Sequence, residues 1–472
     1  MTIEVSNLGK IRYAEFDMKR LTVVCGKNNT GKTYVTHALY GLFDYLRNEF
    51  VYPVEKAKVS ELIEKGSVRF VLDDSPALTD AMLGKACAGY AQVLYKVLAG
   101  SESHFKQSLV RIRTDKSKSL GRVVSYRGIR PVGEGRAVEA YYEAKGHALT
   151  FNLLSESGSG ENGASATDVN YEAVKRFMCE TLRKIQLGGM LPRAHISSVE
   201  RTGAAIFQKE LDFTASGMLE LLRNTKDCGR DPAVFMRSYS GRYPLAVRRN
   251  VDFIRDLPTI SNRESWLLKR HPDLLEDFAD IIGGSYRASR DGIVYFVPSG
   301  KGQTSKLALV ESSSSVRSML DVGFYLRHLA TPGDLFMIDE PELNLHPENQ
   351  RRLARLFARL VNHGIRVFMT THSDYIVKEF NTLMMLNRPD ERLKALAKRE
   401  GYKADELLTA ADVGVYVAQE GIVLKPGSKR RTKAMTLQPA IVSQEEGAVV
   451  PSFDGTIDEM NRIQDAIVWG NS

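Results

Sequence analysis

The sequence lacks the features that mark membrane proteins, secreted proteins and small zinc-binding domains. None of its 472 residues belongs to a run approaching the roughly 18 uninterrupted apolar residues of a membrane span, and its N-terminus has no apolar signal core. The four cysteines form no CxxC pair, which argues against a zinc knuckle; they are Cys25, Cys87, Cys179 and Cys228. We therefore expect a cytoplasmic protein with reduced, buried thiols.

The charge balance is basic, with a formal net charge of +8 and a pI near 9.1. Such a balance favours contact with phosphate, whether of a nucleotide or of a nucleic acid. One run of cations near the end of the chain is either a solvated loop or a docking site for nucleic acid or a partner, and the sequence leaves both readings open. Its members are Lys425, Lys429, Arg430, Arg431 and Lys433.

The pattern along the chain predicts four segments. Residues 1–150 alternate strand-like stretches with turns and contain a glycine loop, and residues 151–290 begin with a Gly/Ser-rich flexible loop and then become mainly helical. Residues 291–380 return to strands, and residues 381–472 form a small separate α+β unit. No sustained heptads occur, so a long coiled coil is not expected.

A phosphate-binding loop is predicted by the sequence GKNNTGKT, which follows the strand-like LTVVC and precedes a helical stretch. The glycines let backbone amides converge on phosphates, the lysine reaches the terminal ones, and the last hydroxyl can ligate Mg²⁺. The predicted nucleotide-binding residues are Gly26, Lys27, Asn28, Asn29, Thr30, Gly31, Lys32 and Thr33, of which Thr33 also binds the metal.

Two acids end the second apolar strand, LFMIDE. We expect Asp339 to hold Mg²⁺ and Glu340 to act either as the general base or as the residue that positions the attacking water. Pro347 then begins a helix with one apolar face, and that helix stops at His363 and Gly364. A third strand, IRVFMTT, delivers His372 to a position from which it can reach a γ-phosphate.

Taken together, GKNNTGKT, LFMIDEPELNLHP and VFMTTHSD resemble the SMC-like and OLD-like branch of the ABC-type ATPases. The resemblance implies an α/β fold: an ABC-type ATPase core, with a mixed P-loop sheet and flanking helices, carrying a helical insert and a small C-terminal α+β unit. It makes Glu340 and His372 the catalytic residues, ATP and Mg²⁺ the cofactors, and Asn344 and His346 part of a loop near a dimer seam.

The same family uses a signature segment that meets ATP from the opposite subunit. The candidate is ESSSSVRSMLDVGFYL, in which Ser313, Ser314 and Ser315 would contact the γ-phosphate of the partner's nucleotide. The transporter signature LSGGQ is absent, which counts against a transporter subunit. A serine-rich helix cap is the alternative reading. The stretch HISSVERTG resembles a segment that related ATPases place between the core and the helical insert. Glu200 and Arg201 are therefore either candidates for sensing nucleotide or partners in a local salt bridge.

The tail carries no nuclease motif. It has no DxD pair of a Toprim module; Asp454 and Asp458 flank a helix start, where carboxylates cap backbone amides, and no histidine follows His372. The resemblance is to stand-alone ATPase subunits of bacterial anti-phage systems of the Septu type or the PARIS type. It implies a homo-oligomer, a dimer or as many as six subunits, and a separate nuclease or toxin effector. The alternatives are a RecF/SMC-like DNA-repair ATPase that binds nucleic acid, and a scaffold that binds ATP and hardly hydrolyses it.

Overall fold

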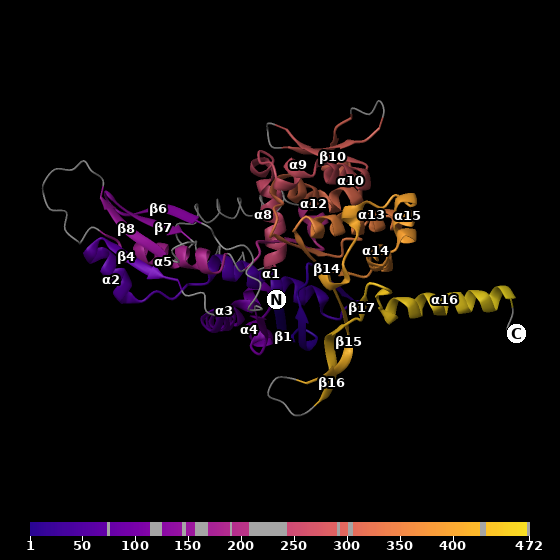
Figure 1. Ribbon diagram of the computed structural model, residues 1–472, viewed down its shortest axis with the longest axis horizontal. Helices are drawn as coiled ribbons and strands as arrows, with labels where there is room; N and C mark the ends of the chain where they lie inside the picture. The colour runs from indigo at the N-terminus through magenta and orange to yellow at the C-terminus, as the bar shows by residue number, and fades with distance from the viewer. Residues whose placement is uncertain are drawn as a thin grey trace, which may run out of the picture. The chain divides into compact units, whose positions relative to one another are not determined.

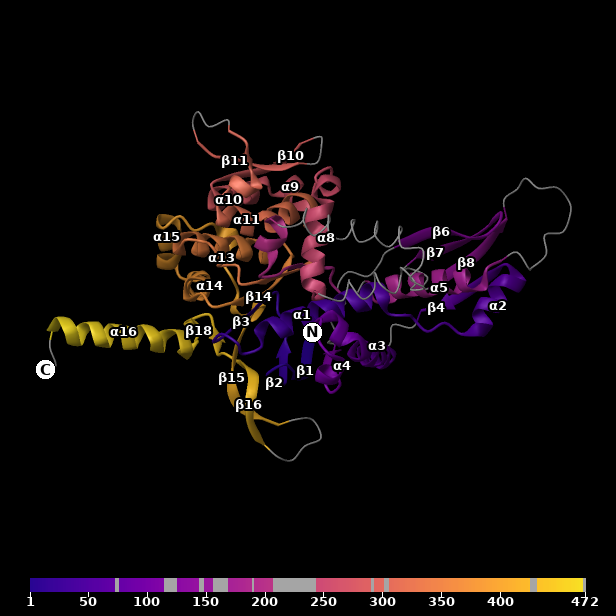
Figure 2. The same cartoon turned by 180° about the vertical axis from the view of Figure 1, so that it is seen from behind.

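The computed structural model describes residues 1–72, 76–113, 125–143, 148–155, 169–188, 191–206, 243–289, 293–300, 305–424 and 431–469. They form two compact units, seen from opposite sides in Figures 1 and 2. Unit 1 comprises Met1–Gly41, Ala91–Arg111 and Ala194–Ser472, and unit 2 comprises Leu42–Tyr90 and Ile112–Arg193. Several sequence predictions concern residues outside the described stretches, namely most of the Gly/Ser-rich segment, Cys228, Lys425, Lys429 and Arg430.

The centre of unit 1 is a six-stranded sheet in the order β16-β15-β3-β14-β13-β9. The strands from β15 to β9 run parallel, and β16 pairs with β15 antiparallel. Every residue of β3 and β13 is buried, as expected for apolar strands covered on both faces. The strands are β3 (Leu21–Cys25), β9 (Ala194–Ser197), β13 (Leu335–Asp339), β14 (Arg366–Thr371), β15 (Val413–Val423) and β16 (Thr432–Pro439).

The register of this sheet aligns the ends of its three central strands. Thr371 lies opposite Cys25, and Asp339 lies opposite Thr370. Because the strands are parallel, the segments that follow β3, β13 and β14 all leave from the same edge of the sheet. This edge is where ligands bind in open α/β sheets.

Helix α13 (Pro347–Asn362) covers the sheet with one apolar face, as predicted. Leu353, Phe357 and Leu360 are fully buried within the core of unit 1. The helix begins at Pro347, and its C-cap is His363, followed by Gly364 at φ 85°. Helix α1 (Lys32–Asp44) follows the phosphate loop, and the predicted flanking helices are thereby confirmed together with the mixed α/β fold.

Smaller sheets complete unit 1. One has the order β2-β1-β5, another β10-β11-β12, and the last pairs β17 with β18. Their strands are β1 (Thr2–Leu8), β2 (Ile11–Asp17), β5 (Leu109–Arg113, which ends in unit 2), β10 (Gly284–Ala288), β11 (Val294–Pro298), β12 (Leu307–Ala308), β17 (Val442–Ser443) and β18 (Gly447–Ala448).

The remaining helical elements of unit 1 surround these sheets. They are α4 (Glu102–Phe105), α8 (Leu245–Ile260), α9 (Trp266–Arg270), α10 (Pro272–Ile282), α11 (Ser314–Ser318), α12 (Leu320–Phe324), α14 (Asp374–Leu386), α15 (Glu391–Arg399), α16 (Pro451–Trp469) and the short turns η4 (Leu309–Glu311), η5 (Tyr325–Leu329), η6 (Ala404–Glu406) and η7 (Ala410–Asp412). Helix α16 projects away from the rest of unit 1 in both views (Figures 1 and 2). None of the described helices is long and apolar enough to cross a membrane.

The C-terminal segment has the predicted mixture of strands and helices, yet it is not separate from the core. Strand β15 pairs with β3, the strand that leads into the phosphate loop, with Val417 opposite Cys25. The hydroxyl of Thr436 on β16 donates to the carbonyl oxygen of Tyr13 on β2 at 2.6 Å, which ties the segment to a second sheet. The physical reason is that VGVYVA is apolar throughout and needs cover on both faces.

Unit 2 is an antiparallel sheet with helices packed on it. The strand order is β4-β8-β7-β6, and the core joins the sheet to α2 (Lys56–Lys65) and α5 (Tyr171–Gln186). Its strands are β4 (Ser67–Val71), β6 (Ser125–Gly133), β7 (Arg136–Glu143) and β8 (Ala148–Ser155), and η1 (Tyr45–Glu49) and most of α3 (Pro76–Val97) also belong to it. The predicted boundaries at residues 150, 290 and 380 do not coincide with those of the units, because α5 belongs to unit 2 while α8, α9 and α10 belong to unit 1.

Candidate nucleotide site

The phosphate loop follows β3 directly and adopts backbone angles that favour glycine. Gly26 has φ 134° and Gly31 has φ 99°, while Asn29, a residue type that tolerates this region, has φ 60°. A Cβ on Gly26 would lie 2.7 Å from the carbonyl oxygen of Ala418 on β15. The C-terminal strand therefore fixes the start of the loop, and a side chain at Gly26 would displace it.

Lys32 begins α1 and is buried, with only 5% of its surface exposed. Its Nζ donates to the carbonyl oxygens of Gly26 at 3.1 Å and Lys27 at 2.9 Å, so the ammonium lies across the loop. Burial lowers the pKa of Lys32, and the carboxylates of Glu340, Glu342 and Asp339 act in the opposite direction. The hydroxyl of Thr30 donates to Lys27 O at 2.8 Å and stiffens the same turn.

Asp339 ends β13 with a fully buried carboxylate. Its Oδ1 accepts a hydrogen bond from the Thr370 hydroxyl at 2.8 Å, whereas Oδ2 has no hydrogen-bond partner among the described residues. The Nε2 of His37, on α1, lies 3.3 Å from this oxygen without forming a hydrogen bond. A buried carboxylate oxygen without a hydrogen bond lowers the stability of a folded protein. Such an oxygen is also the kind of ligand that a hard cation prefers.

The residues present fit magnesium held jointly with phosphates. Within the described part of the chain, no group of three or more His, Cys, Asp or Glu residues forms a metal cage. Mg²⁺ is commonly bound by one or two protein oxygens together with substrate phosphates and waters. The carboxylate of Asp339 and the hydroxyl of Thr33, which is partly exposed at the start of α1, supply such oxygens.

Glu340 leaves the strand with φ 46°, in the left-handed region that non-glycine residues seldom adopt. Its N–H donates to the carbonyl oxygen of Thr370 at 3.0 Å, which holds this conformation. The carboxylate lies 3.4 Å from Nε2 of His372. The hydrogen bond from His372 lowers the pKa of Glu340, with further contributions from Lys32 and Arg201, so the carboxylate is ionised at neutral pH.

The structure brings together the residues predicted from the three motifs. Lys32, Asp339, Glu340 and His372 all lie at the edge where β3, β13 and β14 end. Electrostatic coupling of Lys32 to both acids, and the ion pair between Glu340 and His372, show that they share one site. The roles assigned to these residues stay predictions.

Glu342 belongs to the same site and was not predicted. Its Oε1 accepts a hydrogen bond from the backbone N–H of His372 at 2.5 Å, which fixes the start of the segment after β14. Burial raises the pKa of Glu342, and its Oε2 has no hydrogen-bond partner within the described residues. The spacing D-E-P-E contained the signal, since Glu342 is a third acid close after the two at the strand end.

Arg201 is a fully enclosed residue of unit 1 that connects three segments. Its guanidinium donates to the carbonyl oxygens of Asp339 at 2.6 Å and Glu340 at 2.8 Å. It also donates to Ser198 O at 3.0 Å and to Ser318 O at 2.8 Å, at the end of α11. Arg201 thus makes hydrogen bonds to the backbone rather than the local salt bridge of one alternative, and nucleotide sensing stays a prediction. Glu200, beside it, is exposed.

The serine segment caps its own short helix. The Ser313 hydroxyl accepts from the N–H of Val316 at 3.3 Å and lies 2.8 Å from the Ser315 hydroxyl, and both Ser313 and Ser314 are exposed. The hydrogen bonds described for Ser313, Ser314 and Ser315 stay within residues 313–319. The capping geometry of the alternative reading is thus present, and it leaves the exposed hydroxyls accessible to another molecule.

The segment after Glu342 turns sharply before α13. Asn344 adopts φ 61° and is exposed, and His346 is the N-cap of α13, with its Nδ1 accepting from the N–H of Glu348 at 3.4 Å. The hydroxyl of Ser318 donates to Leu343 O at 3.3 Å. The turn is therefore tied to the serine segment within one chain.

Comparisons with known proteins agree with this site. The family model of the AAA ATPase domain matches residues 1–76 and 271–377, somewhat less than half of the chain. The matched segments contain the phosphate loop, both acids after β13 and His372. No curated protein matches the sequence significantly.

Solved structures of SMC heads are similar to the chain only at low TM-scores. One is an SMC head bound to the C-winged helix domain of ScpA (12% identity, 92% of this chain and 97% of that chain covered, TM-score 0.33). Another is the SMC head domain from Thermotoga maritima (10%, 93% and 98%, 0.29), and a third is an Smc head with an extended coiled coil bound to the C-terminal domain of ScpA from Pyrococcus furiosus (12%, 98% and 98%, 0.31). Similarity at this level indicates neither a shared activity nor shared partners. Residues 1–76 and 271–377 are thus similar to the AAA ATPase domain, and they contain the motifs from which a nucleotide site was predicted.

Proposed function

We propose that the protein binds and hydrolyses ATP with Mg²⁺ at a site completed by a second copy of the same chain. One observation carries the proposal: Lys32, Asp339, Glu340 and His372 converge at one sheet edge, with the Glu340 carboxylate ionised and 3.4 Å from the histidine. These are the groups that ATP hydrolysis needs, namely a phosphate cation, a metal ligand, a base and a polar group beside it.

In this proposal each residue has a defined task. Amides of the phosphate loop and Lys32 bind the phosphates, and Thr33 and Asp339 hold the metal ion, which supplies charge neutralisation when bound. Glu340 accepts the proton of the attacking water, and His372 orients Glu340 and contacts the terminal phosphate. Arg201 and Glu342 position the backbone on which Glu340 and His372 are held.

In this proposal the second subunit contacts the nucleotide with its serine segment. Ser313 and Ser314 are exposed, and the hydrogen bonds described for them remain local, so they are free to face another chain. Ser318 and Arg201 tie this segment to the carbonyls of Leu343, Asp339 and Glu340. In each subunit the serine segment is therefore linked to Glu340 by two hydrogen bonds of Arg201, one to Ser318 and one to Glu340. A nucleotide bound in one subunit that contacts the serines of the other would influence Glu340 of that other subunit through these bonds.

We further propose that ATP-dependent assembly controls a separate nuclease or toxin effector in a bacterial anti-phage complex. This rests on the resemblance of the motifs to Septu-type and PARIS-type ATPases and on an exposed apolar stripe on α16, where Met460, Ile463 and Ile467 recur at helical spacing and Trp469 is 81% exposed. Such a stripe on a projecting helix is suited to docking a partner. The competing function is a RecF/SMC-like DNA-repair ATPase, in keeping with the net charge of +8.

The test compares the wild-type protein with Glu340→Gln. Molecular mass is measured with and without ATP and Mg²⁺, together with phosphate release. We expect ATP to promote self-association, and the variant to retain the associated state while losing turnover. If the molecular mass does not change with ATP and turnover is the same in wild type and Glu340→Gln, the shared site is refuted. DNA-stimulated turnover with steep salt dependence in the absence of any effector would favour the repair function.

A further inference from the structure

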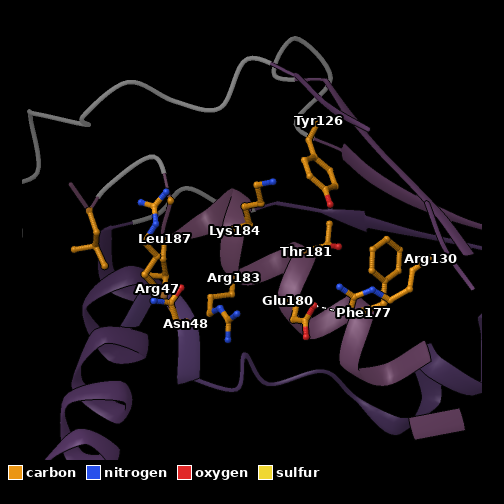
Figure 3. A pocket seen from close by; sticks show the side chains of 12 residues that line it. Arg47, Asn48, Tyr126, Arg130, Phe177, Glu180, Thr181, Arg183, Lys184 and Leu187 are labelled. Atoms are coloured by element: carbon orange, nitrogen blue, oxygen red, sulfur yellow. Dashed lines mark ion pairs between the residues drawn. The ribbon is translucent and has the colours of Figure 1, made fainter. Parts of the chain in front are cut away.

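Unit 2 contains a cavity of about 330 Å³ that the nucleotide site does not use (Figure 3). Its walls come from η1, from β6 and from the C-terminal half of α5 and the residues after it. A volume of this size lies at the lower end of the range for small-molecule sites, about 300–1,000 Å³. The cavity is therefore large enough for a compact ligand.

The lining is strongly basic. It includes Arg47, Arg130, Arg183 and Lys184, against the single carboxylate of Glu180. Glu180 is already committed, because its Oε2 lies 2.7 Å from the guanidinium of Arg130, as the dashed line in Figure 3 marks. Four cations and one acid leave an excess of positive charge that favours an anion.

Two of these cations are held in place without an ion pair to a carboxylate of the described residues. Arg183 donates from Nη1 to the carbonyl oxygen of Phe50 at 2.8 Å, and burial lowers the pKa of its guanidinium. The Nζ of Lys184 lies 4.7 Å from the ring centre of Tyr126, a cation–π contact. Arg183, which is partly buried, and Lys184, which is exposed, are thus positioned by neutral groups and can bind a ligand anion.

A buried hydroxyl points to the same kind of ligand. Thr181 is 1% exposed and lines the cavity, and its Oγ1 has no hydrogen-bond partner among the described residues. Burial of such a group without a partner is unfavourable, and a ligand oxygen would supply the missing partner. Figure 3 shows Thr181 on α5 between Lys184 and Phe177, where its hydroxyl can donate to a ligand oxygen.

Strand β6 forms one wall of this cavity. Tyr126, Gly128 and Arg130 alternate onto one face of β6. A Cβ on Gly128 would lie 2.5 Å from the hydroxyl of Tyr126, so only glycine lets this tyrosine lie along the strand. The tyrosine in turn supports the ammonium of Lys184.

Helix stabilisation explains only part of this arrangement. Arg183 and Lys184 lie in the last turn of α5, where cations interact favourably with the helix dipole. That effect needs neither Arg47 and Arg130, which come from other elements, nor the unpartnered hydroxyl of Thr181.

We propose that the cavity of unit 2 is a second phosphate-binding site, separate from the phosphate loop, in which Arg183 and Lys184 neutralise the phosphate oxygens and Thr181 donates a hydrogen bond to one of them. The phosphate belongs either to a small molecule with a diphosphate or triphosphate group or to the backbone of a single-stranded nucleic acid. The proposal does not depend on ATP hydrolysis in unit 1.

The test uses the full chain with Lys32→Ala, so that binding at the phosphate loop is weakened. Calorimetry measures the affinity for inorganic pyrophosphate and for a single strand of about ten nucleotides. Lys184→Glu should weaken binding of at least one probe by about tenfold or more, and Thr181→Val by a few-fold. The matched control is Arg176→Glu, which makes the same change of charge at an exposed position of the same helix and should alter affinity less than about twofold.

Each result is decisive. Loss of pyrophosphate binding in Lys184→Glu supports a small-molecule site, and loss of oligonucleotide binding alone supports a nucleic-acid site. Both changed residues avoid the Arg183 contact with Phe50, and circular dichroism verifies folding. If Arg176→Glu weakens both probes as much as Lys184→Glu, or if Lys184→Glu weakens neither, the cavity is not a phosphate site and its cations serve only α5.

Discussion

The nucleotide site of unit 1 and the basic cavity of unit 2 present cations to phosphate in different ways. In unit 1, Gly26 to Lys32 form one continuous stretch whose backbone amides are proposed to bind the phosphates, and the acids lie at the end of β13. In unit 2, Arg47, Arg130 and Lys184 come from three elements with no fixed spacing. A site built on one turn of chain leaves a motif in the sequence, whereas a site built from separate elements leaves none.

The comparison is tested most strongly at Glu340. Glu340→Gln keeps the size of the side chain and removes the base, so turnover should fall by about 10²- to 10⁴-fold in a phosphate-release assay. Glu348→Gln, a matched change of an exposed carboxylate in the first turn of α13, should leave turnover unchanged. An equal loss of turnover in both variants would mean that turnover depends on net charge and not on the position of the carboxylate, and Glu340 would then not be the base.

The independence of the units is tested in their cores. Phe151 is fully buried in unit 2 and packs edge-on against Phe70 and Phe177. Phe151→Ala should lower the free energy of unfolding of unit 2 by about 3–5 kcal/mol, measured by hydrogen exchange, while ATP binding is retained.

Phe357→Ala is the matched change in unit 1, since Phe357 is equally buried in the core beneath α13. It should destabilise unit 1 by a similar amount and abolish ATP binding at the temperature where unit 1 unfolds. If Phe151→Ala also abolishes ATP binding, the two units unfold cooperatively, and the prediction that they are independently stable is contradicted.

Arg201 should show a smaller effect with two components. Arg201→Lys keeps a charge but cannot donate to four carbonyl oxygens in a planar fork, so stability should fall by about 2–4 kcal/mol. Turnover should fall by about tenfold even where the protein is folded, because Glu340 loses its backbone support. The control is Arg327→Lys at an exposed position of η5. Unchanged turnover in folded Arg201→Lys would restrict this arginine to a structural role.

The smallest effect concerns acid stability. Arg359 of α13 is buried and donates to Asp273, and this hydrogen bond lowers the pKa of the half-exposed carboxylate. A lowered folded-state pKa contributes stability above the unfolded value of about 3.9, and that contribution is lost as pH falls through the folded pKa.

Asp273→Asn should therefore cost about 1 kcal/mol or less at neutral pH, and the difference from wild type should vanish in strong acid. Chemical denaturation of both proteins across the acid range measures it. Since the ion pair lies in unit 1, hydrogen exchange in unit 2 should not change. A difference that grows on acidification would contradict the sign of the pKa shift.

The predictable part of the molecule was local. GKNNTGKT, LFMID and Pro347 are contiguous signals, and β3, β13 and α13 form where those signals lie. The pairing of β15 with β3 was not predictable, because an apolar strand specifies that it is buried but not beside which strand. Tyr171–Gln186 was correctly expected to be helical, yet nothing in its periodicity indicated packing on a four-stranded sheet rather than beside α8.

The same reasoning applies to the site. The motif residues were predicted because their chemistry depends on sequence neighbours. Arg201 and Glu342 were missed in their actual roles, because both act on carbonyls or amides contributed by distant segments. An arginine three residues after a pair of serines, as in HISSVER, carries no pattern that distinguishes a buried donor from a surface cation.

The position of β3 between β14 and β15 has a consequence for synthesis on the ribosome. The phosphate loop is translated before unit 2, whereas β14 and β15, which flank β3, are translated after it. Unit 2, whose strands lie within residues 42–193, can fold while translation continues. The predicted nucleotide site is thus assembled after unit 2, and a nascent or truncated chain lacking Val413–Val423 exposes an unpaired edge of β3 beside the phosphate loop.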